Sequence, residues 1–187
     1  MRLPAAALLL GVLLPLRQGA AHPHVFIDWH IEPLLANGGI AAVKLFWRFD
    51  DFYSDLVLDT VDRDRDRRLS RPEIDAIAAR TLANLQKARF YASVILDGAA
   101  WQAEKAEHFT ATVEGDHLVY VFTLKLPAPA RAVSVSSLDP EYYIEMQADK
   151  RQPLSGAGFA CTAGRGKPVK TETWGSITPD TVTCGVK

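Results

Sequence analysis

Two short stretches of the sequence hold residues that could bind metal ions, and the first is His22-Pro23-His24. Pro23 favours an extended backbone at the residue before it. In an extended segment, side chains two residues apart point to the same side, with Cβ atoms roughly 6 to 7 Å apart. Two imidazoles can therefore converge on one ion, and imidazole suits zinc, copper, nickel and cobalt. We predict a transition-metal site at His22 and His24, with zinc as the first candidate and nickel, cobalt or copper as the others. The alternative is a pair of terminal histidines without a ligand.

The neighbouring residues limit how this site could be built. Copper and nickel often bind an amino-terminal tripeptide whose third residue is histidine, through its second and third backbone nitrogens. In His22-Pro23-His24 the second residue is Pro23, which has no N–H to lose, so this binding mode is excluded. Asp28 and His30 lie roughly 13 to 20 Å further along an extended strand than His24. The other ligands must therefore come from a different part of the fold.

The second stretch is the segment 62–73, which matches the twelve-residue calcium loop of an EF-hand at its oxygen-bearing positions. The candidate ligands are Asp62, Asp64, Asp66, the backbone carbonyl of Arg68, Ser70 and Glu73. Loop position 6 holds Arg67 where glycine is usual, and a non-glycine residue in the left-handed conformation costs about 1 to 2 kcal/mol. Five arginines, from Arg63 to Arg71, also oppose a divalent ion. We expect weak calcium binding, in the range of about 10⁻⁴ to 10⁻³ M that extracellular calcium modules use.

The same residues allow a simpler interpretation of this segment. Ser70-Arg71-Pro72-Glu73 is a capping box with proline in the first helical turn. The alternation of aspartate and arginine could equally be a solvated loop held by salt bridges. The two interpretations are compatible, and either gives the loop a structural more than a signalling role.

The first residues of the chain predict export. Arg2 precedes an apolar stretch that ends in the small residues Gly19, Ala20 and Ala21. This is the pattern of a secretory signal peptide over residues 1–21, and the stretch is shorter than the roughly 20 apolar residues that a membrane span needs. We expect a single periplasmic domain over residues 22–187, with no transmembrane span. Its two cysteines, Cys161 and Cys184, favour a disulfide, because an exported chain meets an oxidising environment.

Composition and motifs exclude several classes of function. The formal net charge is −1, from 21 basic and 22 acidic residues, and no basic face with interleaved aromatic residues indicates nucleic-acid binding. No hydrolase triad or phosphate-binding loop is visible, so we expect no catalytic function.

The elements that would position these residues are mostly strands. Apolar residues alternate over residues 24–32, and the turn residues Asn37-Gly38-Gly39 separate this segment from an apolar run over 40–49. Apolar residues at helical spacing predict a helix, loop and helix over 52–87, with the acidic loop in the middle. Six further strands are expected over 91–96, 101–107, 109–113, 118–126, 132–136 and 142–147. The pattern predicts an α+β fold, a mostly antiparallel sheet with an inserted EF-hand-like helical hairpin. A poorly patterned tail over 151–187 would be tied by the disulfide.

Four motifs in this order resemble domain-of-unknown-function family 1007. They are His22 to Asp28, Trp47-Arg48-Phe49-Asp50, the acidic loop ending at Glu73, and Asp139-Pro140-Glu141-Tyr142-Tyr143. The resemblance implies an exported component of an uncharacterised transport system, which binds zinc in the periplasm and works with an inner-membrane permease of the nickel/cobalt type. It assigns the metal to His22 and His24, and it leaves the roles of Asp50 and Asp139 open. The alternative function is a calcium-stabilised protein-interaction module without a transition metal.

Overall fold

The computed structural model describes residues 23–149, 151 and 155–187. The predicted signal peptide and His22 lie outside these residues. Two α-helices, α1 (Asp51–Val61) and α2 (Arg71–Lys87), follow one another along the chain, and a short 3₁₀ turn, η1 (Arg89–Tyr91), follows α2. Within the described residues, neither helix has the length and apolar character that a membrane crossing requires.

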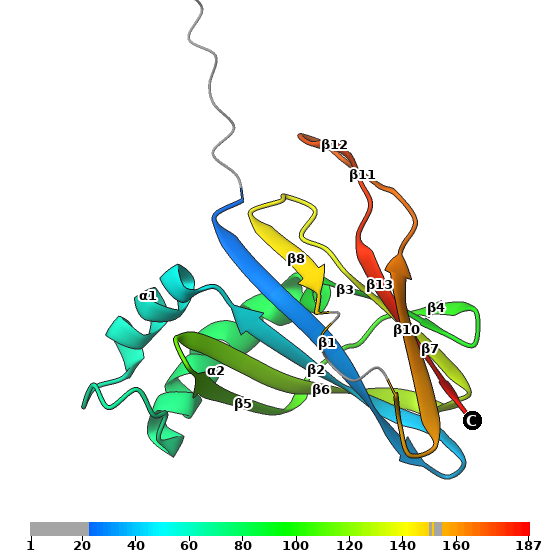
Figure 1. Ribbon diagram of the computed structural model, residues 1–187, viewed down its shortest axis with the longest axis horizontal. Helices are drawn as coiled ribbons and strands as arrows, with labels where there is room; N and C mark the ends of the chain where they lie inside the picture. The colour runs from blue at the N-terminus through cyan, green and yellow to red at the C-terminus, as the bar shows by residue number, and fades with distance from the viewer. Residues whose placement is uncertain (1–22, 150, 152–154) are drawn as a thin grey trace, which may run out of the picture.

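The strands form two large sheets and a small hairpin (Figure 1). Sheet A has five strands in the order β5, β6, β2, β1, β8: β5 (Glu107–Glu114), β6 (His117–Ala130), β2 (Gly39–Phe49), β1 (Val25–Ala36) and β8 (Ile144–Ala148). Sheet B has six strands in the order β4, β3, β7, β13, β10, β9: β4 (Ala99–Trp101), β3 (Ala92–Leu96), β7 (Ala132–Ser137), β13 (Asp180–Val186), β10 (Phe159–Arg165) and β9 (Ser155–Gly156). The hairpin joins β11 (Val169–Thr171) to β12 (Gly175–Ile177).

The first hairpin of sheet A follows the sequence pattern closely. Alternate residues of β1 turn inward, and they include Ile27 and Trp29, which are 1% and 0% exposed. Trp29 lies opposite Trp47 of the antiparallel neighbour β2. On its other side β1 pairs with β8 in parallel, with Val25 opposite Ile144. The predicted strand and its buried face are therefore as expected, and a distant part of the chain supplies its second neighbour.

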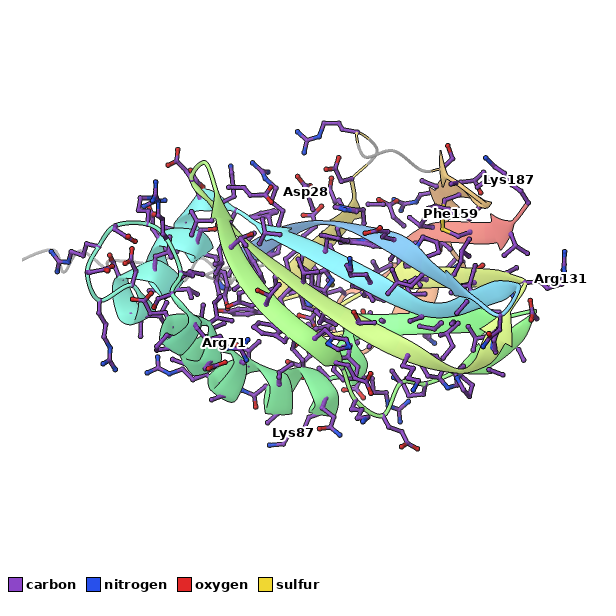
Figure 2. The ribbon with its side chains drawn as sticks, turned by 90° about the horizontal axis from the view of Figure 1, so that it is seen from below. Asp28, Arg71, Lys87, Arg131, Phe159 and Lys187 are labelled. Atoms are coloured by element: carbon purple, nitrogen blue, oxygen red, sulfur yellow. A yellow bond between two sulfur atoms is a disulfide. The ribbon has the colours of Figure 1, made fainter. Side chains whose placement is uncertain are left out.

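The inner face of sheet A packs against sheet B and against the helices, and all of them share one hydrophobic core. Sheet B covers one part of that face, and the shared core includes Val135 of β7 and Val182 of β13. The helices cover another part, and Figure 2 shows α2 running from Arg71 to Lys87 beside the strands. Ser54 of α1 is fully buried, and its hydroxyl oxygen accepts a hydrogen bond from the Leu118 N–H of β6 at 2.8 Å. This contact fixes α1 against the sheet.

The predicted α+β class with an EF-hand-like hairpin is wrong, because the fold is mainly β, with 53% of the described residues in strands and 19% in helices. Two helices do form close to the expected ranges, but they are a small addition to two sheets. The physical reason lies after residue 151, where the chain forms strands that its sequence barely marks. In β13, for example, the only core residues are Val182 and Cys184, separated by exposed Thr183.

The predicted disulfide is confirmed. Cys161 of β10 is bonded to Cys184 of β13, and the two residues lie directly opposite one another in the antiparallel pair. Because β13 lies between β7 and β10 in sheet B, the bridge ties the C-terminal strands to one another inside the sheet.

Candidate functional site

His24 lies at the start of β1 with its side chain exposed. Its backbone N–H donates to the Tyr143 carbonyl at 2.9 Å, and its ring lies 4.9 Å from the Tyr143 ring, centre to centre. The backbone of His24 is therefore fixed to the segment before β8, although β1 itself begins only at Val25. His22, the other predicted ligand, is outside the described residues, so the structure places only one member of the pair.

Asp50 anchors this end of β1 to helix α1. Its Oδ2 accepts a hydrogen bond from the Phe26 N–H at 2.7 Å, and its Oδ1 accepts one from the Tyr53 N–H at 2.8 Å. The second bond makes Asp50 the N-cap of α1. One carboxylate thus fixes both the strand that follows His24 and the first turn of the helix.

Replacing Asp50 should therefore loosen both elements. We expect Asp50→Ala to lower the free energy of unfolding by about 2 kcal/mol, because a lost N-cap costs about 0.5 to 2 kcal/mol and a hydrogen bond to a charged group is lost as well. In a chain of this size the melting temperature should fall by roughly 4 to 8 °C. Asp51→Ala is the matched control, since Asp51 is exposed and its carboxylate accepts, within the described part of the chain, only from its neighbour Phe52. Equal shifts for the two variants would contradict the anchoring role.

Asp139 organises the turn that meets His24. It is 3% exposed, and its carboxylate accepts hydrogen bonds from the backbone N–H groups of Glu141, Tyr143 and Ile144, each at 3.0 Å. These bonds curl the chain so that Tyr143 faces His24 and β8 starts at Ile144. The resemblance left the roles of Asp50 and Asp139 open, and the structure gives both the same task, which is to hold the backbone around His24.

A surface hollow lies beside Tyr143, whose ring contacts the His24 ring. The hollow has a volume of about 610 Å³, and Glu141 and Glu172 also line it. Trp174, which also lines this hollow, donates its indole N–H to the Glu141 carbonyl at 2.9 Å. Sequence reasoning did not find this hollow, because its two walls are separated by some thirty residues of chain, and no local pattern shows that they meet.

The acidic loop brings together only part of its predicted ligand set. Asp62, Asp64 and Asp66 each place one carboxylate oxygen within 4.8 Å of the others, and in the described part of the chain this is the one group of three or more histidine, cysteine or acidic residues that close. Ser70 and Glu73 instead form the predicted capping box, with the Ser70 N–H donating to Glu73 Oε2 at 2.8 Å.

Glu73 also has a second partner within the loop. Its Oε1 accepts a hydrogen bond from the Arg63 N–H at 2.9 Å. The hydrogen bond from the Ser70 hydroxyl, followed by those from the backbone N–H groups of Arg63 and Ser70, lowers the pKa of Glu73. Arg68, whose carbonyl was the predicted ligand, donates its N–H to Asp66 Oδ1 at 2.7 Å.

The remaining histidines have contacts typical of strand residues. The His30 ring stacks on Phe46 at 4.4 Å between centres, and burial lowers its pKa. The His117 Nδ1 lies 2.8 Å from the Phe49 carbonyl oxygen. Neither of them belongs to a group of three potential metal ligands within the described residues.

Comparison with known proteins identifies the family of this chain but no activity. An uncharacterised protein of Haemophilus influenzae is 24% identical over 133 residues. The match covers 67% of this chain and 62% of that relative, so the chain spans less than two thirds of the relative's length. No solved structure shows significant similarity. A family model described as "Protein of unknown function (DUF1007)" matches residues 6–180, and the chain therefore belongs to the DUF1007 family.

Proposed function

We propose that this protein is an exported accessory that captures zinc, or a related divalent transition metal, and delivers it to an inner-membrane permease of the nickel/cobalt type. The observation that supports this proposal most is the environment of His24. The His24 side chain is exposed, and the backbone on either side of it is anchored by two carboxylates, Asp50 through the Phe26 N–H and Asp139 through the Tyr143 N–H. A rigid, accessible ligand at the start of a strand suits the capture of an ion from solution.

The ligand chemistry favours a site that can also release its metal. His22 and His24 would supply two imidazole nitrogens, and zinc prefers four ligands in a tetrahedral arrangement. Glu141 and Glu172, which line the hollow beside Tyr143, are the carboxylates we propose as further ligands. Among the described residues they do not form a group within 4.8 Å together with His24, so their exposed side chains would have to turn toward the ion. A site with fewer than four protein ligands keeps a position open for water or for a ligand from the partner. Metal could then pass to the partner by stepwise ligand exchange.

Exposed apolar side chains near His24 support contact with a partner protein. Phe26, Phe52 and Tyr143 are 47%, 74% and 48% exposed. Phe26 hydrogen-bonds Asp50, Phe52 is in the first turn of α1, and Tyr143 contacts His24, so all three surround the same anchored end of β1. Clustered apolar side chains on a surface commonly mark a protein contact. The disulfide agrees with the proposed periplasmic location, because disulfides persist in oxidising compartments.

Zinc binding should depend on both histidines of the pair. In protein purified after export, zinc at about 100 times the dissociation constant should raise the melting temperature by roughly 5 to 10 °C, because binding to the folded state alone adds about 2.7 kcal/mol. The double variant His22→Ala/His24→Ala should lose this shift, which differential scanning fluorimetry measures.

Two controls make this test specific. His108→Ala removes another exposed histidine and should keep the full zinc response. A chain that retains extra residues before His22 shows whether the free amino terminus is a ligand. An unchanged melting temperature of the wild type in zinc, or an equal zinc shift in the double variant, would overturn the proposal.

A further inference from the structure

The acidic loop between α1 and α2 contains a buried carboxylate oxygen without a partner. Asp62 is 7% exposed, and its Oδ2 accepts a hydrogen bond from the Arg67 N–H at 2.9 Å. Its Oδ1 is also buried, and it finds no hydrogen-bond partner among the residues that the structure describes. Leaving a charged oxygen in this state is costly, because its lost hydration is not replaced. A cation bound at Asp62 would compensate for this lost hydration.

Two further carboxylates face this one. Asp64 and Asp66 each bring an oxygen within 4.8 Å of the Asp62 carboxylate. Desolvation, followed by the negative charge of Asp66, raises the pKa of Asp64, although the Asp66 backbone N–H, which donates to the Asp64 carboxylate, opposes this rise. The three side chains repel one another as they stand, and a shared cation would reverse that repulsion.

The arginines of the loop do not neutralise these carboxylates. Arg67 forms ion pairs with Asp55 at 3.0 Å and with Asp116 at 3.6 Å, both outside the cluster. Arg71 pairs with Asp75 at 2.9 Å. Among the described residues, no arginine lies within ion-pair distance of Asp62, Asp64 or Asp66. The salt bridges of the loop arginines therefore run to residues outside the cluster, and no arginine of the described chain offsets the charge of its three aspartates.

We propose that Asp62, Asp64 and Asp66 bind one calcium ion, which fastens the end of α1 to the start of α2. The donor atoms are all oxygens, which suit hard cations and not the imidazole-preferring metals. Calcium accepts six to eight oxygens in irregular geometry, whereas magnesium requires a near-ideal octahedron. Three carboxylates from alternate residues of one loop, completed by water and backbone carbonyls, fit calcium better.

The structure also changes which residues should bind the ion. Both oxygens of Glu73 are occupied by hydrogen bonds, from Arg63 on one side and Ser70 on the other. Glu73 therefore holds the loop closed from its far end, and the three aspartates bind the ion. Arg67 has a left-handed φ of 57°. The backbone thus already makes the turn at which calcium loops usually place glycine, and no rearrangement of this turn is needed for binding.

The bound ion would also restrain the end of α1, which closes an apolar cavity. A cavity of about 410 Å³ lies between the helices and sheet A, and its walls include Val61 at the end of α1, Ile77 of α2 and Trp47 of β2. Val61 directly precedes Asp62, so an ion at Asp62 restrains the helix end that closes this cavity.

Calcium titration of the exported protein tests this inference. At a calcium concentration of about ten times the dissociation constant, the melting temperature should rise by roughly 3 to 6 °C relative to sodium chloride of equal ionic strength. Magnesium at the same concentration should give less than half of that shift. No calcium shift, or an equal shift with magnesium, would overturn the proposal.

Isosteric variants identify the ligands. Asp64→Asn should weaken calcium binding by at least tenfold, as measured by isothermal titration calorimetry. Asp59→Asn, which removes the same charge from an exposed position on α1, should leave the affinity within about twofold. Equal losses in the two variants would show a general charge effect and would contradict the site.

A third variant separates ion binding from a purely structural role. Asp62→Asn should abolish the calcium shift, while its melting temperature without calcium stays equal to the wild type or rises, because the unpartnered buried charge is gone. A large loss of stability without calcium would show that Asp62 is only a structural acceptor. The calcium and zinc proposals can be overturned separately. Asp64→Asn should keep the zinc response, and the double histidine variant should keep the calcium response.

Discussion

Asp139→Ala should lower the free energy of unfolding by about 3 to 5 kcal/mol, because hydrogen bonds to a charged group are each worth about 1.5 to 3 kcal/mol and part of the loss is recovered through water. The 3%-exposed carboxylate accepts from three backbone N–H groups of one turn, and its removal leaves them without an acceptor. The melting temperature should fall by roughly 6 to 20 °C. Urea unfolding measures the change directly.

Two further variants show whether the carboxylate itself is responsible. Asp139→Asn keeps one acceptor oxygen but turns an NH₂ group toward a backbone donor, so its loss should approach that of Asp139→Ala. Glu141→Ala removes an exposed carboxylate from the same turn and should change stability by less than about 0.5 kcal/mol. A small effect of Asp139→Ala would show that the turn holds its shape without this side chain.

Asp139 should also act on zinc binding as a positioning residue. Tyr143, which Asp139 holds through its N–H, contacts His24 through both its carbonyl and its ring. At a temperature where Asp139→Ala is still folded, its zinc affinity should be lower than that of the wild type, whereas Asp51→Ala should bind zinc normally. Equal zinc affinity in Asp139→Ala would separate the stability of the turn from the proposed metal site.

The elements with a strong local pattern could be predicted from the sequence. Strand β1 alternates buried and more accessible residues from Val25 to Ile31, and its hairpin partner follows a turn rich in glycine and asparagine. The capping box at Ser70 and the close approach of the three loop aspartates also follow from short-range spacing. The disulfide followed from the number of cysteines and the expected export.

The features that depend on distant contacts could not be predicted. The residues of β8 lie beside β1 in parallel although more than a hundred residues separate them, and nothing near Ile144 marks this neighbour. The bond between Phe26 and Asp50 spans 24 residues, so the sequence left the role of Asp50 open, and its anchoring role appears only in the fold. The predicted fold class was wrong for the same reason. The strands after residue 151 are buried by neighbouring strands of the sheet, and their own sequence barely marks them as strands.

Removal of the Cys161–Cys184 disulfide should lower the free energy of unfolding by about 3 kcal/mol, because the bridge closes a loop with a sequence separation of 23 and so restricts the unfolded chain. Cys184 is 0% exposed, which makes alanine a better replacement than serine at this position. The double variant Cys161→Ala/Cys184→Ala should melt roughly 6 to 12 °C below the oxidised wild type. Wild type reduced with dithiothreitol should melt close to the variant.

The same variant tests whether the C-terminal strands and the histidine site are independent. Dithiothreitol should leave the melting temperature of the double alanine variant unchanged, and a decrease there would show that the reductant acts elsewhere. Zinc titrations belong in this variant and not in reduced wild type, because free thiolates are themselves zinc ligands. Since His24 is held by Asp50 and the 139–144 turn, we expect the variant to keep its zinc affinity while it loses stability. A parallel loss of zinc affinity would mean that sheet B, through the hydrogen bond between Asp180 of β13 and Ala148 of β8, helps to position the proposed site.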